Sequence, residues 1–195
     1  GFEVTTLIDA ERSDILGNLA ALRRRIKRED SLLIYYAGHG WFDEGTRRGY
    51  WLPVDASEND PSNWVSAADL TDILRALAAR HVMVVADSCY SGSLTRGLRL
   101  QTRDDAYIQR LARKRARVVL TSGGLEPVTD SGGDGHSVFA RAFLDSLEGN
   151  TGVLEGVAVF NQLRKPVVLG ADQTPEYGDI RFSGHEGGDF LFIRK

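Results

Sequence analysis

The sequence predicts an α/β protein with a mostly parallel central sheet flanked by helices on both faces. Three strongly apolar segments, at residues 32–37, 81–88 and 116–123, are typical of parallel strands buried on both faces. Segments with helical spacing of apolar residues separate these runs, and this alternation is typical of a layered α/β fold. A length of 195 residues fits one domain, residues 1–195.

The first third of the chain predicts a strand, a helix and a second strand. Residues 2–9 contain the β-branched and aromatic residues that strands favour. Ser13 or Asp14 can open a helix, whose apolar residues recur on one face: Ile15, Leu16, Leu19, Leu22 and Ile26. Residues 32–37 then form the first buried strand.

Residues 41–63 contain several glycines and prolines and predict a loop with one short extended piece at residues 50–54. Ser66 opens a second helix that runs to residue 77. The strand at residues 81–88 follows, and it ends at Cys89 in a turn rich in glycine and serine.

The last part of the chain continues the alternation. Residues 105–115 predict a helix and residues 116–123 a strand. Ser137 is a suitable N-cap for the next helix. A further helix at about 154–165 and a closing strand at 188–194 complete the predicted elements.

Composition and charge narrow the classes of partner. The formal net charge of −3 provides no general basic surface, so we expect no nucleic-acid and no membrane partner. The basic segments at residues 22–28 and 110–117 are interpreted as solvated helix faces. No apolar run approaches the ~18 residues of a membrane span, and no signal peptide is visible. Cys89 is the only cysteine, which suits a reducing, cytoplasmic compartment.

Two chemically suggestive residues follow the first two buried strands. Gly38, His39 and Gly40 come after the strand at 32–37, and Cys89 follows the next one. Ligands of open α/β sheets bind at the carboxyl ends of the strands, where both residues are expected. They are 50 residues apart in the sequence and become neighbours if their strands are adjacent.

Such a pair can hydrolyse an acyl bond. Cys89 would supply the nucleophilic thiolate and His39 would move protons near neutral pH. Backbone N–H groups of Gly40 and Cys89 are the candidate oxyanion donors, and the glycines allow close approach of a substrate. The alternatives are a tight turn at His39 and a small buried side chain at Cys89.

The segments "YYAGHG" and, 50 residues later, "DSCYSG" resemble the caspase superfamily, in particular the metacaspases and their bacterial relatives, the orthocaspases. Ala37 replaces the serine and Tyr90 the second histidine of the metacaspase boxes. The segment from "LTSGGLEP" onward and the ending "TPEYGDIRFSGHEGGDFLF" are also similar to bacterial caspase-like proteins, so the resemblance covers nearly the whole chain.

This resemblance implies a caspase-like fold and a cysteine endopeptidase with Cys89 as nucleophile and His39 as general acid and base. Asp87 matches the aspartate with which metacaspases accept arginine or lysine before the scissile bond. A carboxylate complements a guanidinium and repels an acidic side chain. The expected partners are therefore proteins or peptides with basic residues. The alternative for Asp87 is a turn or N-cap residue.

The resemblance also implies features around the domain. Caspase-like domains usually begin with a further strand and helix, and we expect this chain to lack them, either because they are removed or because they lie on a separate chain. The missing N-terminal segment or a regulatory domain, which bacterial relatives often carry, is therefore an expected partner. Zymogens of this kind are often cut after the nucleophile, so self-cleavage is expected at Arg96, Arg99 or Arg103. The alternative is an exposed basic loop. Glu186 is expected to border the substrate groove.

No cofactor is required by this chemistry. The remaining histidines have no metal-ligand spacing with one another or with Cys89, and we expect no metal site: His81, His136 and His185. Carboxylates beside His39 leave calcium activation open, although no EF-hand spacing is present: Asp43, Glu44, Asp55 and Asp60.

Two other functions remain open. One is a catalytically silent caspase-like module that acts as an interaction or regulatory domain. The other is a cysteine hydrolase of related fold, of the separase or CHAT type, which shares the order of histidine before cysteine.

Overall fold

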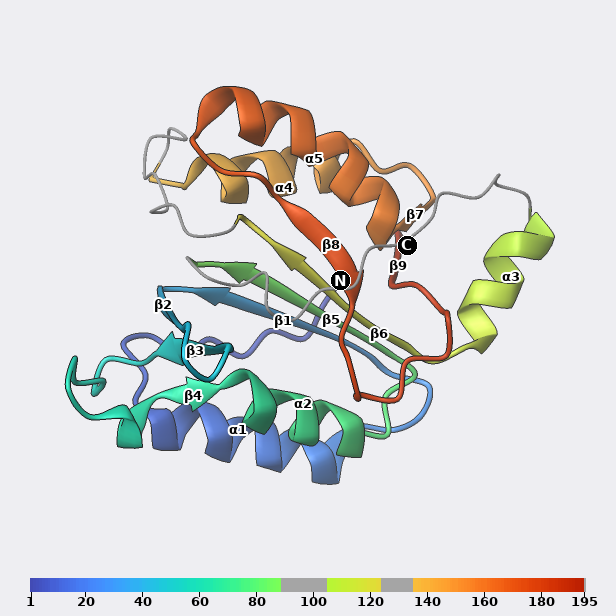
Figure 1. The fold of residues 1–195 in the computed structure, drawn as a ribbon. Coiled ribbons are helices and arrows are strands. Elements are labelled where there is room, and N and C mark those ends of the chain that lie inside the picture. Colours follow the sequence, from blue (N-terminus) through green and yellow to red (C-terminus); the bar gives the residue numbers. More distant parts are fainter. Residues whose placement is uncertain (89–104, 124–134, 195) are drawn as a thin grey trace.

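The computed structural model describes residues 1–88, 105–123 and 135–194 (Figure 1). The elements follow one another along the chain as α1 (Arg12–Arg25), β1 (Ser31–Ala37), β2 (His39–Asp43), β3 (Arg48–Leu52), the 3-10 helix η1 (Pro61–Asn63), β4 (Val65–Ser66), α2 (Ala67–Ala76), β5 (His81–Asp87), α3 (Asp105–Arg113), β6 (Ala116–Thr121), α4 (Val138–Glu148), β7 (Val153–Glu155), α5 (Gly156–Gly170), β8 (Glu176–Asp179) and β9 (Leu191–Ile193).

The central sheet has four strands in the order β1-β5-β6-β8. β1, β5 and β6 are parallel, and β8 pairs antiparallel with β6. This confirms the predicted mostly parallel sheet. β2, β3 and β4 form a small antiparallel sheet beside it, and β7 pairs with β9.

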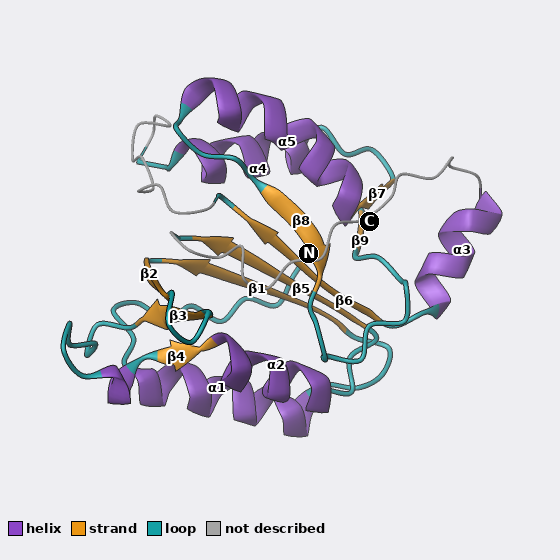
Figure 2. Ribbon diagram, in the orientation of Figure 1, coloured by secondary structure: helices purple, strands orange, loops and turns teal. Residues whose placement is uncertain are grey.

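Helices cover both faces of the central sheet (Figure 2). Met83 and Val85 of β5 pack into the cluster that contains α4 and α5, while Val82 and Val84 pack into the cluster that contains α1 and α2. Alternate residues of a strand point to opposite faces. The middle of a strand covered on both sides is therefore apolar at successive positions, which explains the apolar run from Val82 to Ala86 that predicts β5.

Helix starts agree closely with the sequence analysis. The Ser66 hydroxyl accepts a hydrogen bond from Asp69 N–H at 3.0 Å, and the Ser137 hydroxyl accepts one from Ala140 N–H at 2.8 Å. Both serines are the N-caps of their helices, as predicted. α1 begins slightly earlier than expected, because Glu11 and Asp14 form a capping box.

The predicted strand at residues 2–9 is wrong. This segment forms no strand, and its apolar side chains are exposed, with Val4 76% and Ile8 77% accessible. Strand propensity is satisfied only when the backbone finds a partner, and no strand in the described part of the chain pairs with this segment.

The predicted loop at residues 41–63 contains a hairpin that the sequence analysis missed. β2 pairs with β3, His39 lying opposite Leu52 and Asp43 opposite Arg48. At the turn, Asp43 Oδ1 accepts hydrogen bonds from the N–H groups of Gly45 and Thr46 at 2.9 and 3.2 Å. Of the glycines that suggested a loop, Gly45 lies in the turn that joins the two strands and Gly49 lies in β3.

Arg117 of β6 ties the amino edge of the sheet to the end of α2. Its side chain is fully buried, and burial lowers its pKa to about 10. All five guanidinium N–H groups donate to backbone carbonyls, those of Leu74, Leu77, Ala79, Arg80 and Ala116, at 2.8–3.2 Å. One of these carbonyls, that of Leu74, lies in the last turn of α2 and also accepts the N–H of the C-cap residue Leu77.

Replacing Arg117 by lysine should destabilise the fold. An ammonium has three donors, so at least two of the five buried hydrogen bonds are lost, at a cost of about 1–3 kcal/mol each. We expect Arg117→Lys to lower the free energy of unfolding in urea by about 2–4 kcal/mol. Arg113→Lys, at an exposed position, is the matched control and should change it by less than about 0.5 kcal/mol. Equal midpoints for the two variants would contradict the assigned role.

Asp189 joins β8, β9 and α5 within the core cluster that contains α4 and α5. Its carboxylate accepts hydrogen bonds from the Tyr177 hydroxyl and from the N–H groups of Val157 and Phe190. Burial raises the pKa of Asp189 to about 6, although these three donors act in the opposite direction. The folded state therefore binds a proton that the unfolded state releases at lower pH.

The raised pKa of Asp189 makes stability fall as pH rises. The ordinary pKa of an aspartate carboxyl is 3.8. Because the pKa of Asp189 is higher in the folded state, the free energy of unfolding should fall by up to about 3 kcal/mol between pH 4 and pH 6. The Asp189→Asn variant has no carboxyl to titrate at this position. Its loss of stability relative to wild type should therefore be smaller at pH 7 than at pH 4. Urea unfolding of both proteins at the two pH values measures this difference, and a difference independent of pH would contradict the assignment.

Candidate active site

The candidate site lies at the carboxyl ends of β1 and β5. These strands pair in parallel with Ser31 opposite His81 and Ala37 opposite Asp87, an offset of fifty residues along the whole pair. Gly38 N–H continues the pairing with a hydrogen bond to Asp87 O at 3.4 Å. The strands are therefore adjacent, as the sequence analysis requires.

His39 begins β2 immediately beyond this edge, and its side chain is exposed. Its carbonyl accepts a hydrogen bond from the Tyr36 hydroxyl at 2.7 Å. The Tyr36 ring stacks on buried Trp51 with centroids 4.2 Å apart, and burial keeps the Tyr36 pKa well above its ordinary value. A rigid neutral phenol thus holds the histidine backbone while the imidazole reaches solvent.

Gly38 is required by this packing. A Cβ at this position would lie 2.8 Å from the Tyr36 hydroxyl oxygen and 2.9 Å from its ring carbon. Such contacts are too short for any other residue. The glycine before His39 therefore makes room for Tyr36, a reason that the sequence analysis did not identify.

Asp87, the last residue of β5, is a buried carboxylate with 5% of its surface accessible. Its Oδ2 accepts hydrogen bonds from the Ser137 hydroxyl at 2.5 Å and the Tyr35 hydroxyl at 3.2 Å. Burial, followed by the Asp87 charge, raises the Tyr35 pKa, so this phenol stays a donor. The same Ser137 caps α4, and the positive end of that helix favours a nearby anion.

Tyr35, Tyr36 and Ser137 are site residues that the sequence analysis missed. Ser137 was identified as a cap, but not as a partner of Asp87, because the two are fifty residues apart. Tyr35 and Tyr36 read as ordinary residues of an apolar strand. Their hydroxyls face opposite ways, Tyr35 toward Asp87 and Tyr36 toward His39, as expected of successive strand residues.

Four predicted site residues lie outside the described residues: Cys89, Arg96, Arg99 and Arg103. Cys89 is the next residue in the sequence after Ser88, which is 1% accessible. Gly40 lies in β2 opposite Trp51, so it stays beside His39.

The expectation that Glu186 borders the substrate groove is wrong. Glu186 Oε2 accepts a hydrogen bond from Arg115 N–H at 3.3 Å, and Glu186 N–H donates to Arg115 O at 3.0 Å. Arg115 directly precedes β6, at the amino edge of the sheet, whereas His39 and Asp87 lie at the carboxyl edge. The loop before β9 returns to the other end of the strands from the one expected.

Three of the carboxylates beside His39 accept hydrogen bonds from backbone N–H groups. Asp43 holds its own turn, and hydrogen bonds from Thr46 lower its pKa. Asp60 caps η1 through Ser62 N–H, and Asp55 accepts from Arg12 N–H at 3.0 Å. Within the described ranges, no group of three or more histidine, cysteine, aspartate or glutamate residues could hold a metal ion.

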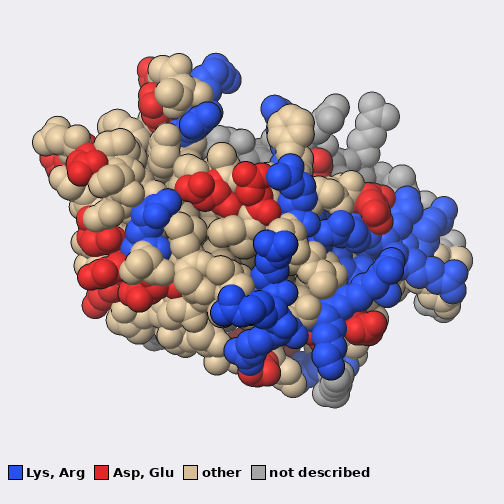
Figure 3. All heavy atoms as spheres, turned by 90° about the horizontal axis from the view of Figure 1, so that it is seen from below, with Lys and Arg blue, Asp and Glu red and all other residues tan. Residues whose placement is uncertain are grey.

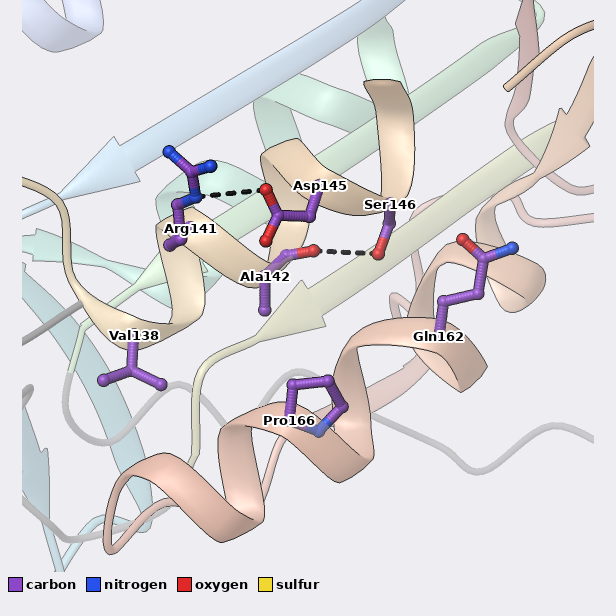
Figure 4. A pocket seen from close by; sticks show the side chains of 7 residues that line it. All are labelled: Val138, Arg141, Ala142, Asp145, Ser146, Gln162 and Pro166. Atoms are coloured by element: carbon purple, nitrogen blue, oxygen red, sulfur yellow. Dashed lines mark hydrogen bonds and ion pairs between the residues drawn. The ribbon is translucent and has the colours of Figure 1, made fainter. Parts of the chain in front are cut away.

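A pocket of about 340 Å³ lies between α4 and α5 (Figure 4), away from these residues. Its polar groups bind one another: Arg141 pairs with Asp145 at 3.0 Å, and the Ser146 hydroxyl donates to Ala142 O at 2.8 Å. None of the predicted site residues lines it. None of the helices in the described part of the chain has the length and apolar character that a membrane span requires.

Comparison with known proteins identifies the family and the fold. The family model for the caspase domain matches residues 1–181. The crystal structure of protein GSU0716 from Geobacter sulfurreducens is similar, with a TM-score of 0.59 at 17% identity, over 95% of this chain and 82% of that chain. At this identity the likeness concerns the fold alone. No curated protein matches. On the match over residues 1–181, the chain belongs to the caspase-domain family.

Proposed function

We propose that this protein is a cysteine endopeptidase in which Cys89 is the nucleophile and His39 the general acid and base. The observation that carries the proposal is the β1–β5 pairing. Its offset of fifty residues equals the sequence separation of His39 from Cys89, so the two follow paired strand ends. Membership of the caspase-domain family supports the same chemistry.

In the proposed reaction, the Cys89 thiolate attacks the carbonyl carbon of the scissile bond. A C–S bond forms and the carbonyl oxygen takes up the negative charge. Backbone N–H groups of Gly40 and Cys89 would donate to that oxygen. When the tetrahedral intermediate collapses, the C–N bond breaks and His39 protonates the departing amine. His39 then accepts a proton from water as the water attacks the thioester, which releases the acid and the thiolate.

We further propose that Asp87 selects arginine, and lysine second, before the scissile bond. Its carboxylate precedes Cys89 by two residues and is held by Ser137 and Tyr35. A carboxylate fixed in this way keeps its position when a substrate binds, so little ordering is needed to receive a guanidinium. Tyr35, which donates to this carboxylate, is itself 42% accessible.

Activity should depend on both members of the dyad. We expect cleavage of fluorogenic peptides with Arg or Lys before the scissile bond, and none with Asp. Cys89→Ala should reduce cleavage to background, and His39→Gln should lower kcat/KM by about 10²–10⁴-fold. Assays with calcium and with chelator test calcium activation. A wild-type protein that circular dichroism shows to be folded, and that still cleaves no peptide under either condition, would favour the catalytically silent module.

The same incubation tests self-processing. Cleavage after Arg96, Arg99 or Arg103 would give two fragments that mass spectrometry assigns to one of these bonds. The Cys89→Ala protein should remain intact, which separates self-cleavage from a contaminating protease.

The selectivity proposal has a sharper test in a pair of isosteric peptides. Citrulline matches arginine in shape but carries no charge. Wild type should prefer the arginine peptide by roughly tenfold to a hundredfold in kcat/KM, the value of a hydrogen bond to a charged partner. Asp87→Asn should remove most of that preference. Tyr35→Phe loses one hydrogen bond to Asp87 but keeps the charge, so it should retain the preference. An unchanged arginine-to-citrulline ratio in Asp87→Asn would refute the assignment.

A further inference from the structure

The amino edge of the sheet carries a concentrated positive charge. We use the term basic edge for the surface formed by six residues: Arg23, Arg24, Arg28, Arg80, Arg113 and Lys114. The first three lie at the end of α1 and in the loop after it, and the last two at and just after the end of α3. Arg80 connects them, because its N–H donates to Arg28 O at 3.2 Å and its guanidinium donates to Ala112 O at 3.3 Å.

These cations are available to a partner. Arg80 is half-buried and the other five are exposed. Within the described ranges, none of the six forms an ion pair, whereas neighbouring Arg25 and Arg75 pair with Glu3 and Asp72. Figure 3 shows Lys and Arg gathered on one side of the molecule and Asp and Glu mainly on the other. The net charge of −3 is a sum over the whole chain and does not reveal this uneven distribution of charged side chains.

An exposed aromatic ring lies on the loop beside the basic edge. Phe182 is 85% accessible and has a φ of 60°, a backbone conformation that is unfavourable for a bulky residue. Its turn is fixed at both ends, by Ile180 N–H bonded to Arg117 O at 2.8 Å and by Glu186 N–H bonded to Arg115 O. In Figure 1 this loop passes between the end of α2 and α3.

The loop lies directly against the basic residues. A Cβ built on Gly184 would lie 3.3 Å from a guanidinium nitrogen of Arg115, and one built on Gly187 would lie 3.7 Å from Lys114 Nζ. The loop that carries exposed Phe182 therefore packs against Lys114 and Arg115. Strained and solvent-exposed bulky residues concentrate at functional sites.

We propose that the basic edge and Phe182 bind single-stranded nucleic acid, with arginines on successive phosphates and one base stacked on Phe182. Guanidinium groups match phosphate geometry, and aromatic platforms within a positive surface are typical of single-strand binding. An acidic peptide has no base that could stack on the exposed ring. In duplex DNA the bases are stacked inside the helix and are not available to it. The strands separate this surface from His39 by about 20 Å, so it is distinct from the candidate active site.

Fluorescence anisotropy with labelled 20-nucleotide oligo(dT) and oligo(U) tests the proposal. Both should bind, and affinity should fall as salt rises. Replacing Arg23, Arg24, Arg113 and Lys114 together by glutamine should weaken binding and reduce the log–log salt slope by about 0.7 for each phosphate that the variant no longer neutralises. The matched control carries Arg47, Arg48, Arg164 and Lys165 as glutamine, the same charge change away from the basic edge. Equal weakening in the two variants would overturn the assigned surface.

Phe182→Asn separates stacking from charge, since asparagine tolerates a positive φ. It should weaken oligonucleotide binding roughly tenfold with the salt slope unchanged, while Phe182→Tyr keeps the affinity. Duplex DNA, polyglutamate and phosphatidylserine vesicles are the competing ligands. Equal or tighter binding of any of them would overturn the single-strand proposal. These assays require no catalysis, so their outcome is independent of the peptidase activity.

Discussion

The parallel pairing of β1 with β5 in one register is the constraint on which the rest of this structure depends. Seven consecutive pairs, from Ser31–His81 to Ala37–Asp87, keep an offset of fifty residues. A slip of one residue would turn each apolar side chain of β5 to the opposite face, where the other core cluster lies. Packing of Met83 and Val85 on one side, and of Val82 and Val84 on the other, therefore determines what meets at the carboxyl edge.

Asp87 links the elements that this register brings to the carboxyl edge. Its buried carboxylate gathers the Tyr35 hydroxyl from β1 and the Ser137 hydroxyl from the start of α4. A buried charge is tolerated only with partners of this kind. The end of β5, the neighbouring strand and one helix terminus are thereby held together directly before the nucleophile that we propose.

The two ends of the sheet differ in electrostatic character. At the carboxyl edge, His39 lies beside a hairpin and loop rich in carboxylates, of which Asp43, Asp55 and Asp60 accept hydrogen bonds from backbone N–H groups. At the amino edge, Arg117 is buried among carbonyls, and exposed cations lie around it. The expectation of no nucleic-acid partner rested on net charge, which cannot report how a fold distributes charge between two ends.

The sequence by itself determined the layered α/β class and the helix starts at Ser66 and Ser137, because apolar periodicity and capping depend on neighbouring residues. It also supplied the pair of His39 and Cys89 on which the proposed function rests. Tertiary structure decided the rest. Residues 2–9 have strand propensity but no described partner strand, and Gly38 is explained only by the packed ring of Tyr36. The position of Glu186 at the amino edge and the meeting of two distant basic segments follow from how the chain returns to the sheet. Contacts between distant residues are set by register and packing, which no local pattern encodes.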